Sequence, residues 1–302
     1  MAARKQAEGK EVAGNTVDLT ASEERAVLDR SGLRAEVVFE SVLREGRDEL
    51  QRSPLALAFS GLSAGLSMGF SLLFMGLIAS SLPETPWRPL AVTLGYTAGF
   101  VIVILGRQQL FTENTITAVI PLLDANDRTG VFGKAARLWG VVLATNLIGA
   151  ALVALAFAHA PVVGPAIGAA MRDIGAAAAA PDMVTLFVRA IFAGWLLALM
   201  VWLLPSAHGM KLLVILMVSY LVGALQFSHA IAGSVEVFYA VFTGAVPPIA
   251  YLHFAVPTVL GNAIGGVFLV SLLGYGQVAP KGEAVEAPSG SAKAKRTERG
   301  GP

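Results

Sequence analysis

Two long apolar runs of the sequence are each interrupted by a short polar stretch, Leu-Phe-Thr-Glu-Asn-Thr at residues 110–115 and Phe-Ser-His-Ala-Ile-Ala-Gly at residues 227–233. The two breaks are separated by 116 positions, counted from Phe111 in the first to Phe227 in the second. Irregular backbone within a membrane is tolerated only where it is buried in protein or lines a cavity. Matched breaks in the two halves of a membrane protein are typical of a binding or conduction site near the bilayer midplane. We therefore expect the two breaks to meet at such a site.

The composition supports a membrane protein with polar ends. The chain is 55% hydrophobic, and its mean hydropathy is +0.66. Of its 43 Asp, Glu, Lys and Arg residues, 20 lie in residues 1–52 and 8 in residues 276–302. We expect an N-terminal tail with an amphipathic helix over 1–52, a membrane domain over 53–275 and a disordered basic tail over 276–302. Both tails are expected to be cytoplasmic.

The function classes that the sequence excludes are those that need particular side chains. The chain has no Cys, which excludes disulfides and thiolate metal sites. Its four scattered His residues do not form a zinc site. No basic stripe indicates nucleic acid as a partner, and no nucleophile–base arrangement indicates an enzyme. We expect no cofactor and no metal.

Six membrane spans account for the apolar runs, since a crossing helix needs about 20 residues. They are expected at about 54–81, 89–123, 133–159, 183–204, 210–246 and 253–275, with the breaks in the second and fifth. Three spans in each half force the two halves into inverted topology. The sequence therefore predicts an all-α membrane protein of two inverted three-helix repeats, with broken second and fifth helices that meet as in aquaporins.

The positions of Lys and Arg in the short loops set the orientation. The loop after the second span holds Arg128, Lys134 and Arg137, and the loop after the fourth holds Lys211. The loops after the first and third spans offer only Arg88 and Arg172. We therefore expect both termini on the cytoplasmic side of a bacterial-type inner membrane.

Three segments resemble the formate/nitrite transporter family. They are residues 106–112 (Gly-Arg-Gln-Gln-Leu-Phe-Thr), residues 227–232 (Phe-Ser-His-Ala-Ile-Ala) and residues 261–266 (Gly-Asn-Ala-Ile-Gly-Gly). The resemblance covers roughly residues 50–275 and implies a homopentamer in which each protomer conducts small monovalent anions together with protons. It also implies that Leu110, Phe111 and Thr112 line the first break and that His229 is the central pore histidine.

The chain departs from the pattern of many characterised members at four positions. Asp182 stands where they have Lys, Ala198 where they often have Asn, Ser228 where they often have Glu, and Glu113 where they usually have a small residue. An Asp at a vestibule repels anions that a Lys would attract. The departures indicate a less-characterised branch of the family, so they leave the substrate open.

His229 is the natural proton donor of the expected site, because the unperturbed pKa of His is about 6.5. An anion that crosses an apolar constriction bears a large desolvation cost. A proton taken from His229 would lower that cost by converting the anion of a weak acid into the neutral acid.

Glu113 has two interpretations. The 116-residue interval pairs it with His229, and two such groups at the midplane would each favour the charged form of the other. Alternatively, Glu113 is an acid at the start of the helix that follows the break, where the helix dipole favours negative charge.

The remaining candidates fall into two groups. The expected constriction consists of Leu110, Phe111, Phe100 and Val222. Structural support of the broken helices is expected from Asn146, Asn262, Asn114, Ser228 and Glu236. For Glu236 we expect a helix-capping role behind Ser234, a plausible N-cap.

The sequence thus favours a channel or transporter for a small weak-acid anion. One alternative is passage of a neutral or cationic solute such as ammonia, which Glu113 and Asp182 would favour. Another is a membrane sensor or scaffold with a vestigial pore. The expected partners are the lipid bilayer, a small molecule or ion as the substrate, and further copies of the chain in a homopentamer.

Overall fold

The computed structural model describes residues 33–125 and 127–272, together with Thr20, Ser22, Gly274 and Gly276. Most of the predicted N-terminal tail and all of the basic C-terminal tail beyond Gly276 lie outside the described residues. The chain divides into two units at Arg34. All helices named below belong to the unit that begins at Ala35.

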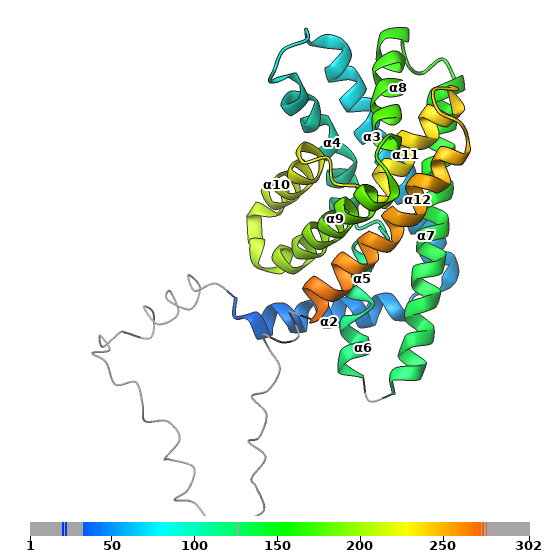
Figure 1. The fold of residues 1–302 in the computed structure, drawn as a ribbon. Coiled ribbons are helices and arrows are strands. Elements are labelled where there is room, and N and C mark those ends of the chain that lie inside the picture. Colours follow the sequence, from blue (N-terminus) through cyan, green and yellow to red (C-terminus); the bar gives the residue numbers. More distant parts are fainter. Residues whose placement is uncertain are drawn as a thin grey trace, which may run out of the picture. The chain divides into compact units, whose positions relative to one another are not determined.

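The first half of the membrane domain contains the first broken helix. Its elements are α3 (Pro54–Ser81), α4 (Arg88–Leu105), α5 (Asn114–Thr117), α6 (Ile120–Asp124) and α7 (Arg128–His159). Residues 106–113 form the first break, between α4 and α5. The predicted second span is therefore one long helix followed by two short ones (Figure 1).

The second half repeats this plan. Its elements are α8 (Pro165–Ala179), α9 (Met183–Leu203), the 3₁₀ helix η1 (Leu204–Met210), α10 (Lys211–Ala224), α11 (Ala230–Phe242), α12 (Ile249–Ile264) and the π-helix η2 (Gly265–Leu272). Residues 225–229 form the second break, between α10 and α11. At η1 the backbone of His208 leaves the helical region, and the chain turns back so that α10 lies beside α9 (Figure 1).

Most of the long helices are apolar enough to cross a membrane. Within the described residues, five helices meet the length and composition for a crossing: 54–81, 88–105, 128–159, 183–224 and 249–268. The range 183–224 contains α9, η1 and α10, which the turn at η1 divides. With α11 as a shorter apolar helix, these elements account for the six predicted spans.

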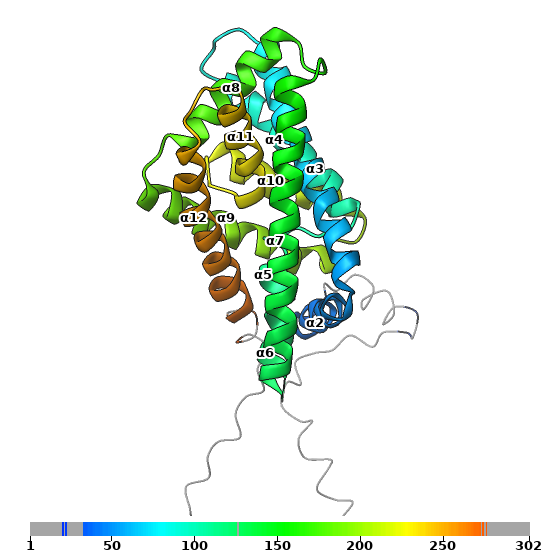
Figure 2. The same cartoon turned by 90° about the vertical axis from the view of Figure 1, so that its right-hand side faces the viewer.

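Close backbone contacts hold each half together at equivalent places. A Cβ atom added to Gly65 on α3 would lie 2.2 Å from the carbonyl oxygen of Asn146 on α7. A Cβ atom added to Gly194 on α9 would lie 2.2 Å from the carbonyl oxygen of Asn262 on α12. Glycine therefore lets α3 approach α7, and α9 approach α12, at the level of the two asparagines that support the breaks. Figure 2 shows α7 running past both α3 and α11.

In the region over residues 1–52, where we expect an amphipathic helix, the described residues contain α2 (Ala35–Gln51). Its apolar face is packed, because Val42 and Leu43 are buried in a cluster with Ile116 of α5 and Ile120 of α6. An ion pair of 2.6 Å between Arg47 and Asp124 adds a polar contact to α6. The helix therefore packs on the membrane domain beside the first break.

Candidate functional site

His229 and Thr112 meet at the point where the two breaks approach each other. His229 precedes α11, and its Nδ1 atom accepts a hydrogen bond from the backbone N–H of Ala232 at 3.0 Å. Its Nε2 atom lies 2.9 Å from the Thr112 hydroxyl oxygen. A neutral imidazole has one donor and one acceptor nitrogen. The neutral ring therefore carries its proton on Nε2 and donates it to Thr112.

One apolar ring packs against His229, and the other residues of the expected constriction belong to the same buried core. The ring of Phe100 meets the His229 ring edge-on, with centroids 5.1 Å apart. Leu110 and Val222 are fully buried in the same core cluster. Phe111 belongs to this cluster as well, but its ring packs on Trp139 of α7 with centroids 6.0 Å apart. All four residues of the expected constriction are thus buried.

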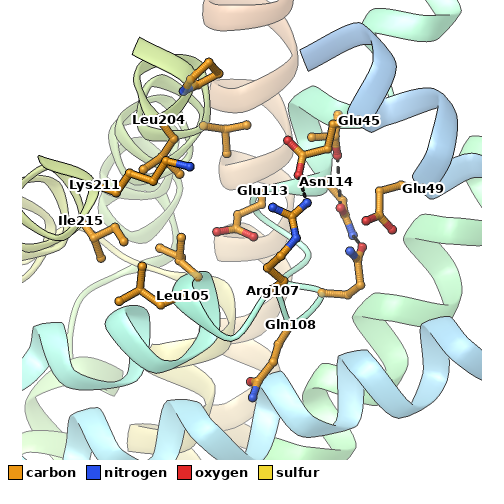
Figure 3. A pocket seen from close by; sticks show the side chains of 15 residues that line it. Glu45, Glu49, Leu105, Arg107, Gln108, Glu113, Asn114, Leu204, Lys211 and Ile215 are labelled. Atoms are coloured by element: carbon orange, nitrogen blue, oxygen red, sulfur yellow. Dashed lines mark hydrogen bonds and ion pairs between the residues drawn. The ribbon is translucent and has the colours of Figure 1, made fainter. Parts of the chain in front are cut away.

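Two cavities lie on either side of the His229–Thr112 contact. The α2-side cavity, of about 320 Å³, is lined by Glu45, Glu49, Arg107, Gln108, Glu113, Lys211 and neighbouring residues (Figure 3). The α8-side cavity, of about 260 Å³, is lined by Thr93, Tyr96, Arg189, Gln226, His229, Glu236 and neighbouring residues. Glu113 follows Thr112 in the chain and lines the first cavity, whereas His229 lines the second. The buried contact therefore lies between the two.

Glu113 does not pair with His229, so that interpretation of the sequence is wrong. The Thr112 side chain points to His229, and the next side chain along the break turns to the α2-side cavity. There Figure 3 shows the Glu113 carboxylate beside Arg107, whose guanidinium is paired with Glu45 at 2.8 Å. Glu113 precedes α5 but its side chain makes no capping hydrogen bond. Within the described residues, its buried Oε1 atom has no hydrogen-bond partner.

Asn146 of α7 supports the first break through three hydrogen bonds. Its Oδ1 atom accepts from the backbone N–H of Phe111 at 2.9 Å. Its Nδ2 group donates to the carbonyl oxygens of Gln109 at 2.9 Å and Gly61 at 2.8 Å. The amide therefore satisfies two backbone groups of the break, at Phe111 and Gln109, and ties the break to α3 through Gly61.

Asn262 of α12 supports the second break in the same way. Its Oδ1 atom accepts from the backbone N–H of Ala230 at 2.8 Å. Its Nδ2 group donates to the carbonyl oxygens of Ser228 at 2.9 Å and Ala190 at 2.7 Å. Since Ser228 and Ala230 flank His229, Asn262 also fixes the backbone that carries the histidine.

The two breaks correspond with an offset that differs from the 116 positions inferred from sequence. Phe111 and Ala230 receive equivalent bonds and lie 119 positions apart. Arg107 and Gln226 have the same offset and the same unusual positive φ, 49° and 52°. The structural equivalent of His229 is therefore Leu110, and the pairing of Glu113 with His229 came from an offset that is wrong by three residues.

Glu236 does not cap a helix, contrary to the expectation from sequence. The helix begins at Ala230, with His229 as its N-cap, so Glu236 lies in the interior of α11. The hydroxyl of Ser234 donates to the carbonyl oxygen of Ala230 instead. Glu236 is 8% exposed and lines the α8-side cavity with His229. The seven-residue spacing of the two residues, which places them on one helix face, was the signal that could have revealed this position.

The other two predicted supports act within the breaks. The Asn114 side chain donates to Gln109 Oε1 at 3.0 Å and accepts from the Thr117 hydroxyl at 3.2 Å, while its backbone carbonyl accepts from Trp139 Nε1 at 2.8 Å. Ser228 contributes its carbonyl oxygen to Asn262.

Two of the departures from the family pattern have structural roles. Asp182 caps α9, because its carboxylate accepts from the backbone N–H groups of Val184 and Thr185 and from the Thr185 hydroxyl. The hydroxyl bond, with the backbone bonds, holds the pKa of the Asp182 carboxyl below its usual value. Ala198 of α9 is fully buried in the apolar cluster that contains Val42 and Leu43 of α2.

Residues 35–276 match the family model described as Formate/nitrite transporter. Among curated proteins, the chain is similar to Inner membrane protein YfdC of Escherichia coli (strain K12), with 40% identity over 83% of this chain and 81% of that protein. It is also similar to Uncharacterized transporter YrhG of Bacillus subtilis (strain 168), with 26% identity over 78% of this chain and 90% of that protein.

Two solved structures share the fold. One is described as an FNT family ion channel, with a TM-score of 0.70 and 20% identity, and the match covers 81% of this chain and 100% of that chain. The other is described as a pentameric formate channel with formate bound, with a TM-score of 0.61 and 19% identity, and the match covers 73% of this chain and 95% of that chain. The predicted all-α membrane fold is confirmed by these matches.

Proposed function

Since the chain belongs to the formate/nitrite transporter family, we propose that it carries a small monovalent weak-acid anion across the membrane together with a proton. The chain is then a transport protein and not an enzyme. The observation that carries this proposal is the buried contact between His229 and Thr112, which joins the two breaks between two cavities.

The apolar surroundings of the contact explain why a proton is needed. A charged ion that leaves water for the contact beside Phe100, in a core that also contains Leu110 and Val222, loses its hydration with little compensation. The neutral acid is far easier to desolvate. The permeating species at the contact is therefore the neutral acid, which exchanges hydrogen bonds with the Thr112 hydroxyl and the Nε2–H of His229 as it passes.

The hydrogen bond at Nδ1 limits how His229 supplies a proton. A neutral ring that gave up its Nε2 proton would become an anion, so transfer to the substrate requires that Nδ1 is protonated first. Protonation at Nδ1 displaces the N–H of Ala232, at a cost of about 1–3 kcal/mol for an unsatisfied buried donor. His229 therefore acts as a hydrogen-bond donor in its resting state, and as a proton donor only when the charged ring forms.

The proposal extends to the assembly and the orientation of the chain. We extend to this chain the pentameric state of the second solved structure, with one path through each protomer. We also extend the inner-membrane location that the name of the Escherichia coli relative gives. With the orientation expected from the Lys and Arg residues of the loops, the α2-side cavity opens to the cytoplasm.

A neutral solute such as ammonia is the second candidate, and it is favoured by the carboxyl groups in both cavities. Glu113 lines one cavity and Glu236 the other, and negative charge in a vestibule repels anions.

Flux into proteoliposomes separates the two candidates. Purified protein is tested for uptake of formate, acetate, nitrite and ammonia at pH 5 and pH 7, with liposomes free of protein as the control. Uptake of one or more of the three anions that rises at pH 5 supports the proposal. Ammonia uptake without anion uptake at either pH contradicts it and favours the second candidate.

A further inference from the structure

One face of α11 forms a wall of the α8-side cavity. His229, Gly233 and Glu236 line this cavity, and their spacing of four and then three residues places them on one side of the helix. Figure 1 shows α11 beside α8 and α12. Seven residues correspond to about 10 Å along a helix axis. Glu236 therefore stands about two turns farther along the cavity wall than His229.

The surroundings of Glu236 suit a carboxylic acid better than a carboxylate. The residue is 8% exposed. Across residues 33–125 and 127–272, its carboxyl group has no hydrogen bond and no ion pair to the protein. An unpaired carboxylate is costly in such a place, and the neutral acid costs far less. A carboxyl group in an apolar helix of a membrane protein is also rare unless it has a function.

Few other titratable groups share the cavity with Glu236. They are Tyr96 from α4, Arg189 from α9 and His229 itself. The helices packed around α11 contribute apolar side chains to the cavity: Met75 from α3, Ile174, Ala177 and Ala178 from α8, and Phe254 from α12. The α8 helix also contacts the Glu236 backbone, since a Cβ atom on Gly175 would lie 2.2 Å from its carbonyl oxygen.

We propose that Glu236 is a second proton-binding residue of the permeation path, which exchanges a proton with the weak-acid substrate in the α8-side cavity. In this step the O–H bond of the Glu236 carboxylic acid breaks and an O–H bond forms on the substrate anion. Hydronium from the solution at that end then protonates the Glu236 carboxylate again. The reverse sequence operates for transport in the other direction. This inference rests on the proposed function.

The step assigns different tasks to the two residues. Glu236 neutralises the substrate in the α8-side cavity, before the substrate reaches the apolar contact. His229 then needs only to donate a hydrogen bond from Nε2 at the apolar contact, and it keeps the bond that Nδ1 receives from Ala232. The costly charged ring is not required in every cycle.

Formate flux of Glu236→Gln in proteoliposomes tests the proposal. Glutamine keeps the size and polarity of the side chain, but its amide does not bind or release a proton at the pH of the assay. We expect a loss of at least tenfold in formate flux at pH 7 and a flatter dependence of flux on pH. Glu236→Asp, which keeps the carboxyl group, should recover the pH dependence. Asp173→Asn, which removes an exposed carboxylate of α8 away from the cavity lining, should behave as the wild type.

The outcomes separate this inference from the proposed function. Formate flux by the wild type, with the same rate and pH profile in Glu236→Gln, would overturn the role of Glu236 alone. Faster formate flux in Glu236→Gln would overturn it as well, because the side chain would then act as a repelling charge. Absence of flux for every weak acid in the wild type would overturn both.

Chemical labelling of the wild-type protein gives a test that does not depend on folding of a variant. Dicyclohexylcarbodiimide reacts with protonated carboxyl groups in apolar surroundings, and mass spectrometry of peptides locates the product. We expect labelling of Glu236 that decreases as the pH rises. Transport-active protein in which Glu236 stays unlabelled across the pH range would overturn the proposal.

Discussion

Replacement of Asn262 by alanine should reduce both stability and transport. The change removes the three hydrogen bonds of 2.7–2.9 Å that the amide makes to the backbone of α9 and of the second break. A buried hydrogen bond contributes about 0.5–1.5 kcal/mol net, and measured values within membranes average about 0.6 kcal/mol. Three such bonds predict a loss of about 2–4 kcal/mol in the free energy of unfolding.

Reversible unfolding in mixtures of detergent and sodium dodecyl sulfate measures this loss. Thr258→Val is the matched control on the same helix, because the buried Thr258 hydroxyl has no hydrogen-bond partner within the described residues. Removal of an unpaired buried hydroxyl should leave the free energy of unfolding unchanged or raise it. A loss for Asn262→Ala below about 0.5 kcal/mol, or one no larger than that of Thr258→Val, would refute the reasoning.

The same substitution should slow transport, because Asn262 holds the backbone at Ser228 and Ala230, on both sides of His229. Asn146→Ala removes the three equivalent bonds at the first break. It should lower the free energy of unfolding by a similar amount. Loss of stability in only one of the two variants would contradict the equivalence of the breaks.

Three further substitutions test other features of the molecule. Thr112→Val removes the acceptor of the His229 Nε2–H at constant shape. We expect formate flux to fall at least tenfold, which corresponds to about 1.4 kcal/mol in activation free energy. Thr112→Ser keeps the hydroxyl and should keep the flux. Gly194→Ala places a Cβ atom against the α12 backbone and should lower the free energy of unfolding by about 1–3 kcal/mol. Gly140→Ala, with open space around the added Cβ atom, should not lower it. Asp182→Asn should lower the melting temperature at neutral pH. The pKa of Asp182 is lower in the folded protein than in the unfolded chain. The stabilisation by its carboxylate is therefore fully present above the unfolded pKa of about 3.9, and it is lost as the pH falls through the folded pKa. The melting temperatures of the wild type and the variant should converge in acid.

The sequence predicted the spans well because apolar runs have sharp ends. The run predicted over 54–81 is observed as α3 with the same bounds, where the Ser53 hydroxyl accepts from the Ala56 N–H and Pro54 begins the helix. The third span begins at Arg128 and not at 133, because the Asp127 side chain caps it by accepting from the Gly130 N–H. Hydropathy does not register such a polar cap.

The relation between the two halves was harder to predict. The 116-residue interval is correct for Asn146 and Asn262, which have equivalent bonds, but each break lies at a different distance from its asparagine. The chain from Phe111 to Asn146 is three residues longer than the chain from Ala230 to Asn262. Matching of short motifs carries no information on such a difference in length, so the pairing of Glu113 with His229 was wrong.

The start of α11 explains the error at Glu236. Side chains of Ser, Thr, Asp and Asn are the usual N-caps, which favoured Ser234 as the N-cap. The cap observed is the imidazole Nδ1 of His229, which accepts from Ala232. The N-cap therefore lies five residues earlier than expected, and Glu236 moves from the first turn of the helix to the wall of the cavity.

Simultaneous measurement of formate uptake and internal pH in proteoliposomes tests the central claim most directly. If the substrate passes the His229–Thr112 contact as a neutral acid, one proton enters with each formate ion, and both signals collapse together in His229→Ala. Formate uptake without acidification of the interior, or uptake at the wild-type rate in His229→Ala, would contradict the account.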